Sequence, residues 1–199
     1  MDTHTPHTPV IVYNPLSIER EDLVEGEINS PHAWKGIRVR DTEGNMLKCQ
    51  LTRFSEGKQG FIFAGKVPSL GFAVFDIEEA NDVEETNDST FTITDGQMEN
   101  AKYRVTLNPQ TGDIKSIYDK QLSQELLSAP LRLALLPCKS TSWPAWEIPY
   151  STLTATPTYV NNSDGTLHVS VAEDGPLRKS FRIERTRLGS TFVQYIQLT

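Results

Sequence analysis

The sequence predicts an all-β protein, and three observations support this fold class. The apolar residues are largely β-branched or aromatic, which are the types enriched in strands. Twelve glycines and twelve prolines divide the chain into short segments. No long stretch places apolar residues at the i, i+3, i+4, i+7 spacing of an amphipathic helix. Short strands joined by turns are therefore expected throughout.

The first part of the chain predicts a small β-sandwich over residues 9–79. Its strand patterns cover residues 9–13, 17–28, 37–39, 47–51, 60–64 and 67–77. Pro15 ends the first strand because proline has no N–H for a ladder. Gly44 and Asn45 suit a hairpin turn, since both tolerate positive φ. Residues 1–8 are polar and lack an apolar pattern, so we expect them to form a disordered lead.

A run of acidic residues separates this sandwich from the second half of the chain. Seven acids and no base occur between positions 76 and 88, namely Asp76, Glu78, Glu79, Asp82, Glu84, Glu85 and Asp88. Charges of one sign repel one another, so we expect the run to be solvated rather than to form a calcium or catalytic cluster. The run predicts an acidic linker over residues 80–89 and a second domain over residues 90–199.

The second domain opens on a predicted β-hairpin. Tyr103, Val105 and Leu107 alternate with polar residues, which is typical of a strand with one buried face. The segment 108–112 supplies the turn, because Pro109 fixes φ and Gly112 accepts positive φ. The return strand occupies residues 114–118.

Further strand patterns fill the rest of the second domain. They cover residues 131–136, 156–160, 167–171, 178–185 and 191–198, with turns at 161–165 and 174–176. Three arginines of this region, Arg182, Arg185 and Arg187, are expected on the solvent side of their strand. The last strand pattern has no closing element after it, so the second domain is expected to be truncated.

Composition excludes several classes of partner. The formal net charge of −7 argues against a nucleic acid or an anionic membrane, because both require a basic surface. Cys49 and Cys138 lie far apart without metal spacing, and we expect free thiols. The N-terminus has no secretion signal or membrane anchor, so a cytoplasmic location is expected.

No catalytic residue and no metal ligand are predicted in this chain. Zinc requires three or four ligands that converge on one point, and the histidines His4, His7, His32 and His168 show no such cluster. His4 and His7 share an H-x-x-H spacing, but we expect them to be exposed in the lead. No Ser-His-Asp order, nucleophile elbow or phosphate loop is present.

Five separated phrases of the chain resemble the C-terminal β-region of glycoside hydrolase family 38, the α-mannosidases, and they occur in the family's order. The phrases are Tyr13-Asn14-Pro15-Leu16-Ser17, Val67-Pro68-Ser69-Leu70-Gly71, Ser116-Ile117-Tyr118-Asp119-Lys120, Trp143-Pro144-Ala145-Trp146-Glu147-Ile148 and Gly175-Pro176-Leu177-Arg178. The resemblance implies that residues 90–199 are the N-terminal part of a large, mutarotase-like antiparallel super-sandwich.

The same resemblance implies a function for the parent protein. It would be a retaining, zinc-dependent α-mannosidase that hydrolyses terminal α-mannosides. The family's catalytic aspartate, its zinc and most zinc ligands belong to a preceding α/β catalytic domain, whose motifs have no counterpart here. This chain alone is therefore expected to be inactive, to brace its own catalytic domain and to contribute a loop to the sugar pocket.

Trp143, Trp146 and Glu147 are the predicted sugar-binding residues. Indole faces stack on the apolar face of a pyranose, and a carboxylate accepts hydrogen bonds from sugar hydroxyls. Another interpretation is that both tryptophans fill a core or pack against the catalytic domain. Two other functions remain open: a free-standing carbohydrate-binding or adhesion sandwich, and an aldose epimerase that would require a His and Glu pair with His168.

Overall fold

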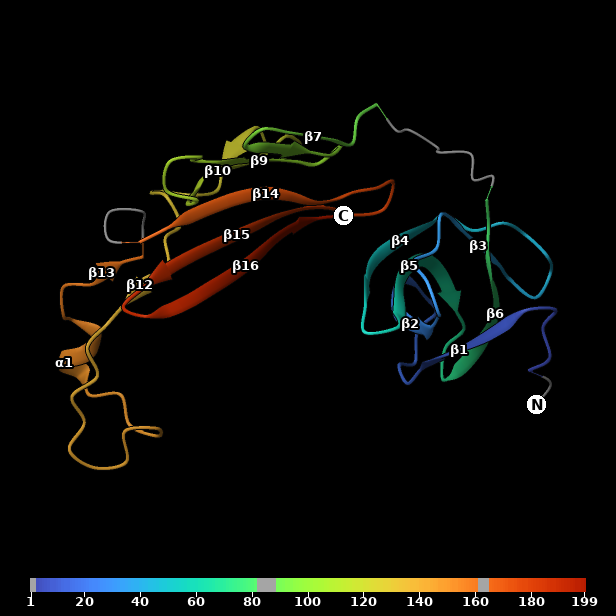
Figure 1. Ribbon diagram of the computed structural model, residues 1–199, viewed down its shortest axis with the longest axis horizontal. Helices are drawn as coiled ribbons and strands as arrows, with labels where there is room; N and C mark the ends of the chain where they lie inside the picture. Colours follow the sequence, from blue (N-terminus) through green and yellow to red (C-terminus); the bar gives the residue numbers. More distant parts are fainter. Residues whose placement is uncertain (1–2, 82–88, 161–164) are drawn as a thin grey trace. The chain divides into compact units, whose positions relative to one another are not determined.

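The computed structural model describes residues 3–81, 89–160 and 165–199 (Figure 1). The chain forms two compact units. The first comprises Met1–Ser89, Glu173–Lys179 and Thr199, and the second comprises Thr90–Ala172 and Ser180–Leu198. Most of the predicted linker and of the turn at 161–165 lie outside the described residues. The strands are antiparallel, and the prediction of an all-β fold is confirmed.

The first unit contains two sheets of three strands each. One has the order β1-β6-β3 and the other the order β2-β5-β4 (Figure 1). The strands are β1 (Thr8–Asn14), β2 (Arg20–Asn29), β3 (Ile37–Arg40), β4 (Cys49–Ser55), β5 (Lys58–Val67) and β6 (Gly71–Glu79). Strand β5 is almost entirely buried because it is the central strand of its sheet.

Residues from both sheets build the core of the first unit. Phe61 and Phe63 alternate along β5 and therefore share its inner face. The ring centroid of Phe63 lies 4.8 Å from that of Phe75 on β6. The remaining core residues are Ile37, Val39, Val67 and Ile77. This packing of one sheet against the other makes the first unit a small β-sandwich.

The buried side chain of Asn14 fixes the end of β1. Its Nδ2 group lies 2.7 Å from the carbonyl oxygen of Ile18, 3.0 Å from that of Pro68 and 3.3 Å from that of Val67. Its Oδ1 atom accepts the N–H of Leu16 at 3.1 Å. One side chain thus satisfies backbone groups that Pro15 and Pro68 keep out of the sheet ladders.

The turn Glu173–Lys179 also belongs to the first unit. The amide of Gln50 donates to the carbonyl of Arg178 at 3.1 Å and accepts the N–H groups of Leu177 and Arg178 at 3.0 and 2.9 Å. A Cβ at Gly175 would lie 2.0 Å from Cδ of Gln50, so this position requires glycine. The guanidinium of Arg178 donates to the carboxylates of Glu25 and Glu173, and these bonds raise its pKa.

The second unit contains a sheet of the order β11-β10-β9-β8-β7, a sheet of the order β14-β15-β16 and the short pair β12-β13 (Figure 1). The strands of the first sheet are β7 (Thr92–Thr94), β8 (Gln97–Glu99), β9 (Tyr103–Leu107), β10 (Ile114–Asp119) and β11 (Gln124–Glu125). The others are β12 (Ala134–Leu135), β13 (Thr158–Tyr159), β14 (Leu167–Asp174), β15 (Lys179–Arg187) and β16 (Ser190–Leu198). The helix α1 (Tyr150–Leu153) precedes β13.

The core of the second unit is made by the two larger sheets. Met98, Val105, Leu107 and Ile114 from the first sheet contact Phe181 and Ile183 of β15 and Leu198 of β16. The predicted hairpin is confirmed, with Val105 paired to Ile117 and Gly112 at a φ of +70°. The N–H of Gly112 donates to the carbonyl of Asn108 at 2.7 Å and closes the turn.

The prediction that Arg185 faces solvent is wrong. Its side chain is 1% exposed, because positions 181, 183 and 185 alternate along β15 and share the inward face. The guanidinium donates to the carbonyl of Thr111 at 3.0 and 3.1 Å and lies 3.4 Å from a carboxylate oxygen of Asp113. A Cβ at Gly112 would lie 2.8 Å from Nη2 of Arg185, so the hairpin turn and the buried arginine depend on each other.

Replacing Asn14 with alanine should destabilise the first unit by about 2–4 kcal/mol, because several carbonyl groups lose their donor at once. Urea unfolding, followed by NMR signals of β2 and β5, measures this free energy. The control is Asn45→Ala, which removes an exposed amide that bonds to Asp41 and should cost less than about 1 kcal/mol. Equal losses in the two variants would contradict the anchoring role of Asn14.

Replacing Arg185 with methionine should destabilise the second unit by about 3 kcal/mol or more. The variant leaves the carbonyl of Thr111 without its donors and the half-buried Asp113 without its cation. Arg182→Met is the matched control, because Arg182 lies on the other face of β15 and is 31% exposed. Unfolding monitored by signals of β9 and β10 measures both, and an Arg185→Met variant as stable as the control would refute the argument.

Candidate functional site

The predicted sugar-binding residues lie together in one exposed turn between β12 and α1. Trp143 is 69% exposed and Trp146 is 86% exposed, and Glu147 is also exposed. The N–H groups of Trp146 and Glu147 donate to the carbonyl of Trp143 at 2.8 and 2.9 Å. The structure thus brings all three residues together, and neither indole fills a core of this chain.

The backbone of Trp143 is strained. Its φ is +52°, in the left-handed region that bulky residues rarely adopt. A conformation of this kind costs roughly 1–3 kcal/mol and persists only where the surroundings hold it, often at functional sites. The two N–H groups that share the carbonyl of Trp143 compensate part of this cost.

The base of this turn is anchored although its tip is exposed. The hydroxyl of Thr152, a buried residue of α1, donates to the carbonyl of Pro137 at 3.3 Å. The N–H of Val160 donates to the carbonyl of Leu133 at 2.8 Å, and Val160 is buried. The aromatic turn is therefore presented from a fixed base.

Other large apolar side chains are exposed near the aromatic turn. They are Ile148, Tyr150 and Leu153, each more than half exposed. Exposed apolar groups in such number are typical of a binding or packing surface rather than of a freely solvated loop. The chemistry of this surface suits a ligand with an apolar face and hydroxyl groups, or an apolar protein surface.

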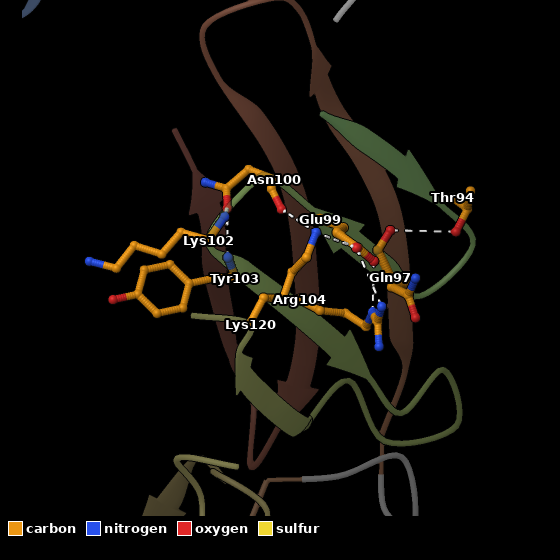
Figure 2. A network of polar contacts seen from close by, with 8 residues as sticks. All are labelled: Thr94, Gln97, Glu99, Asn100, Lys102, Tyr103, Arg104 and Lys120. Carbon is orange, nitrogen blue, oxygen red and sulfur yellow. Dashed lines mark hydrogen bonds and ion pairs between the residues drawn. The ribbon is translucent and has the colours of Figure 1, made fainter. Parts of the chain in front are cut away.

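A second polar site lies on the hairpin sheet, around Glu99 (Figure 2). Its carboxylate accepts Nε of Arg104 at 2.6 Å and Nζ of Lys120 at 2.7 Å. Lys120 also donates to the carbonyl of Asn100 at 2.9 Å, and Oδ1 of Asn100 accepts the N–H groups of Lys102 and Tyr103 (Figure 2). The side chain of Glu99 is mostly buried among these partners.

The bonds from Arg104, and then those from Lys120, lower the pKa of Glu99 from its ordinary value to about 2. A carboxyl with that pKa has no proton to donate at neutral pH, so Glu99 is a structural tie rather than a general acid. The sequence prediction missed this group. Glu99 lies opposite Arg104 across β8 and β9, so a cross-strand charge pair was the signal for it.

Within residues 3–81, 89–160 and 165–199, no three or more His, Cys, Asp or Glu side chains converge in a way that would hold a metal ion. The two cysteines, Cys49 and Cys138, are both free. No helix among the described residues has the length and apolar character needed to span a membrane.

The acid sensitivity of the second unit should depend on Glu99. Because its pKa is lowered from 4.5 to about 2, its ion pairs add stability above the unfolded value, and this stability is lost as the pH falls through the folded value. Glu99→Gln should be less stable than the natural protein at neutral pH, and the difference should shrink between about pH 4.5 and pH 2. Urea unfolding at a series of pH values measures the difference.

The matched control for this experiment is Glu147→Gln in the same unit. Glu147 is exposed, and its backbone bonds to Trp143 and Cys138 do not involve the carboxylate. An exposed carboxylate of this kind contributes little to stability, so Glu147→Gln should change the free energy of unfolding at neutral pH by less than about 0.5 kcal/mol. A Glu99→Gln difference that stays constant from neutral to acid pH would contradict the assigned role.

Two solved structures resemble this chain in fold. A protein in the glycosyl hydrolase family 38 from Enterococcus faecalis superposes with a TM-score of 0.54 at 12% identity, over 89% of this chain and 24% of that chain. An α-mannosidase from Enterococcus faecalis V583 superposes with a TM-score of 0.51 at 13% identity, over 89% of this chain and 23% of that one. At these identities the likeness shows the fold alone, and the chain spans about a quarter of their length.

No curated protein matches the sequence of this chain. The model of the "Glycosyl hydrolases family 38 C-terminal domain" matches residues 98–199, which is just over half of the chain. The resemblance predicted from the five phrases is thus confirmed. The chain belongs to family 38 of the glycosyl hydrolases, as a part that contains its C-terminal domain.

Proposed function

We propose that this chain is a non-catalytic C-terminal β-region of a retaining, zinc-dependent α-mannosidase. The larger enzyme would hydrolyse terminal α-mannosides, and this region would brace its catalytic domain. The observation that carries the proposal is the family match over residues 98–199, together with coverage of only about a quarter of an α-mannosidase of the same fold.

The carboxyl groups of the chain support a structural role. Retaining glycosidases use two carboxyls about 5–5.5 Å apart, one of which has a raised pKa as general acid. Among the described residues, every carboxyl with a resolved pKa shift is shifted downward. These are Glu25, Asp41, Asp76, Glu99 and Glu125. Each is bonded to cations or N–H groups and is ionised at neutral pH.

Among the described residues, no group of three or more His, Cys, Asp or Glu side chains is placed to bind zinc. Zinc requires three or four N, S or O ligands at one point, and the ring of His168 belongs to no such group. We therefore assign the zinc to the catalytic domain, outside this chain.

The aromatic turn is the part of this chain that we propose to contact the mannoside. Trp143 and Trp146 expose their indole faces, and the adjacent Glu147 exposes a carboxylate that accepts hydrogen bonds from hydroxyls. The strained φ of Trp143 supports this role, because such strain concentrates at ligand sites. The turn would supply one wall of the sugar pocket, completed by the catalytic domain.

A second function is a free-standing carbohydrate-binding sandwich. The observation in its favour is the same: two tryptophans exposed on a turn with an anchored base. The two functions differ in what the isolated chain does. A complete binding module holds sugar alone, whereas a pocket wall requires the catalytic domain.

The purified chain should not hydrolyse an aryl α-mannoside, with or without added zinc or cobalt. The reason is that no metal-binding group of side chains converges among the described residues, and that each carboxyl with a resolved pKa shift is held ionised. Release of the aryl group measured by absorbance checks this. Turnover that co-purifies with the chain, and that requires the added metal, would refute the non-catalytic assignment.

Mannose titrations of tryptophan fluorescence separate the two functions. For a pocket wall, the isolated chain should show no saturable change. In the full-length enzyme, Trp146→Ala should raise KM for an aryl α-mannoside about three- to tenfold, the loss of one aromatic contact. Leu122→Ala, at a similarly exposed residue in the turn between β10 and β11, is the control and should leave KM unchanged. Saturable quenching in the isolated chain, lost in Trp146→Ala, would instead establish the binding module.

A further inference from the structure

Strand β16 (Ser190–Leu198) forms an edge of a sheet in the second unit. It ends the sheet order β14-β15-β16, so within the part of the chain that the structure describes only one of its sides is paired with another strand (Figure 1). Such an edge presents a row of N–H and C=O groups that can pair with a strand of another chain. With 9 residues, β16 is long enough for an extensive pairing of this kind.

The edge of β16 lacks the features that protect other edges. Natural proteins protect edge strands with proline, charged side chains, bulges or short length. Among the described residues, β1 contains Pro9, β2 contains five charged residues, β4 has an irregular register against β5, and β14 ends in two acids. The strands β3, β7, β11, β12 and β13 have four residues or fewer. Strand β16, with the sequence STFVQYIQL, contains neither proline nor a charged residue.

The hairpin that joins β15 to β16 determines which backbone groups face outward. Its loop consists of Leu188 and Gly189, with φ values of +52° and +73°, as in a two-residue type I′ turn. Such a turn makes Arg187 and Ser190 a hydrogen-bonded pair, and in an antiparallel ladder only alternate residues bond to the same neighbour. Every second residue of β16 therefore directs its N–H and C=O groups away from β15. These residues are Thr191, Val193, Tyr195 and Gln197.

We propose that β16 is a self-association edge, along which it pairs antiparallel with β16 of a second copy of this chain. Pairing centred on Gln194 gives a contact with two-fold symmetry, in which the same residues serve both copies. In this register Val193 exchanges backbone hydrogen bonds with Tyr195 of the second copy, and Thr191 does so with Gln197. Every outward-facing residue is then paired, and two three-stranded sheets become one continuous sheet.

The side chains of β16 are self-complementary in this register. On the exposed face, Val193 lies opposite Tyr195 of the second copy, and these side chains are 43% and 50% exposed in a single chain. Pairs of an aromatic and a β-branched residue stabilise antiparallel strands. On the half-buried face, Phe192 lies opposite Ile196, and Gln194 lies opposite its own counterpart. A register centred one residue to either side would instead place Gln194 opposite Phe192 or Ile196.

The contact is narrow, so the dimer should be weak and should depend on concentration. Small interfaces are typical of transient complexes, and we expect dimers at chain concentrations of about 100 µM. Sedimentation equilibrium of the whole chain should then show an average mass that rises from that of one chain toward that of two. Amide hydrogen exchange at Val193 and Tyr195 should slow over the same range of concentration. Exchange at Gln194 should not change, because its N–H is bonded to β15 in both states.

Two variants test the register of the contact. Val193→Lys with Tyr195→Lys places lysine opposite lysine twice across the two-fold axis, and like charges in directly opposite positions destabilise a sheet. This variant should stay monomeric. Val193→Lys with Tyr195→Glu places each new lysine opposite a new glutamate of the second copy, so it should dimerise at least tenfold more tightly than the variant with two lysines. Both positions are exposed, and unchanged amide shifts of β9 and β10 would show that the fold is kept.

The matched control places two lysines on the opposite edge of the same sheet. His168 and Val171 are exposed residues of β14, and His168→Lys with Val171→Lys should leave the association unchanged. A natural chain that is still monomeric at about 1 mM would overturn the proposal. So would a dimer that persists when both Val193 and Tyr195 are replaced by lysine, or one that the lysine and glutamate combination does not restore.

Discussion

The alternation of side chains along antiparallel strands is the constraint on which both units depend. In each unit, every second residue of two sheets points inward, and these residues form the core: Phe61 and Phe63 in the first, Phe181 and Ile183 in the second. A slip of one residue in register would move such a set to the solvent face. Register must therefore be fixed at the strand ends, and polar side chains do so here.

Asn14 and Arg185 are the two clearest examples of this fixing. Asn14 joins the end of β1 to carbonyl groups of Val67 and Pro68, and Arg185 joins β15 to the hairpin turn at Thr111. Both side chains are buried, and both bind backbone oxygens. Every residue has a backbone oxygen. A buried polar side chain can therefore fix the position of a turn without requiring a particular side chain in that turn.

Much of the fold could be predicted from the sequence because its signals are local. Alternation predicted the hairpin around Val105, and Gly112 marked its turn through the need for positive φ. The burial of Arg185 could also have been predicted, because Arg185 lies two residues after Ile183 and therefore on the same face of the strand. Its charge alone led to the wrong prediction that it faces solvent. Its acceptor is far away in sequence, and no local pattern names such a partner. The same holds for the bonds of Asn14 to Val67 and Pro68.

The candidate site likewise has features that the sequence could predict and features that it could not. The residue types of Trp143, Trp146 and Glu147 were enough to find the aromatic turn, whereas the left-handed backbone at Trp143 was not predictable, because a bulky residue before a proline disfavours it. The Glu99 network was missed because opposite charges across two strands appear only once the register is known.

The carboxylates with a resolved pKa shift have one use in common, which differs from that of a catalytic acid. A general acid must keep a proton at neutral pH, which requires an apolar or like-charged surrounding that destabilises the folded protein. Glu99 and Glu25 have the opposite surrounding, because arginine and lysine groups hold them ionised. At every carboxyl for which the structure resolves a pKa shift, the pKa is lowered, so the surroundings favour the ionised form. The carboxyls with a resolved shift therefore act as structural ties that hold neighbouring strands and turns together.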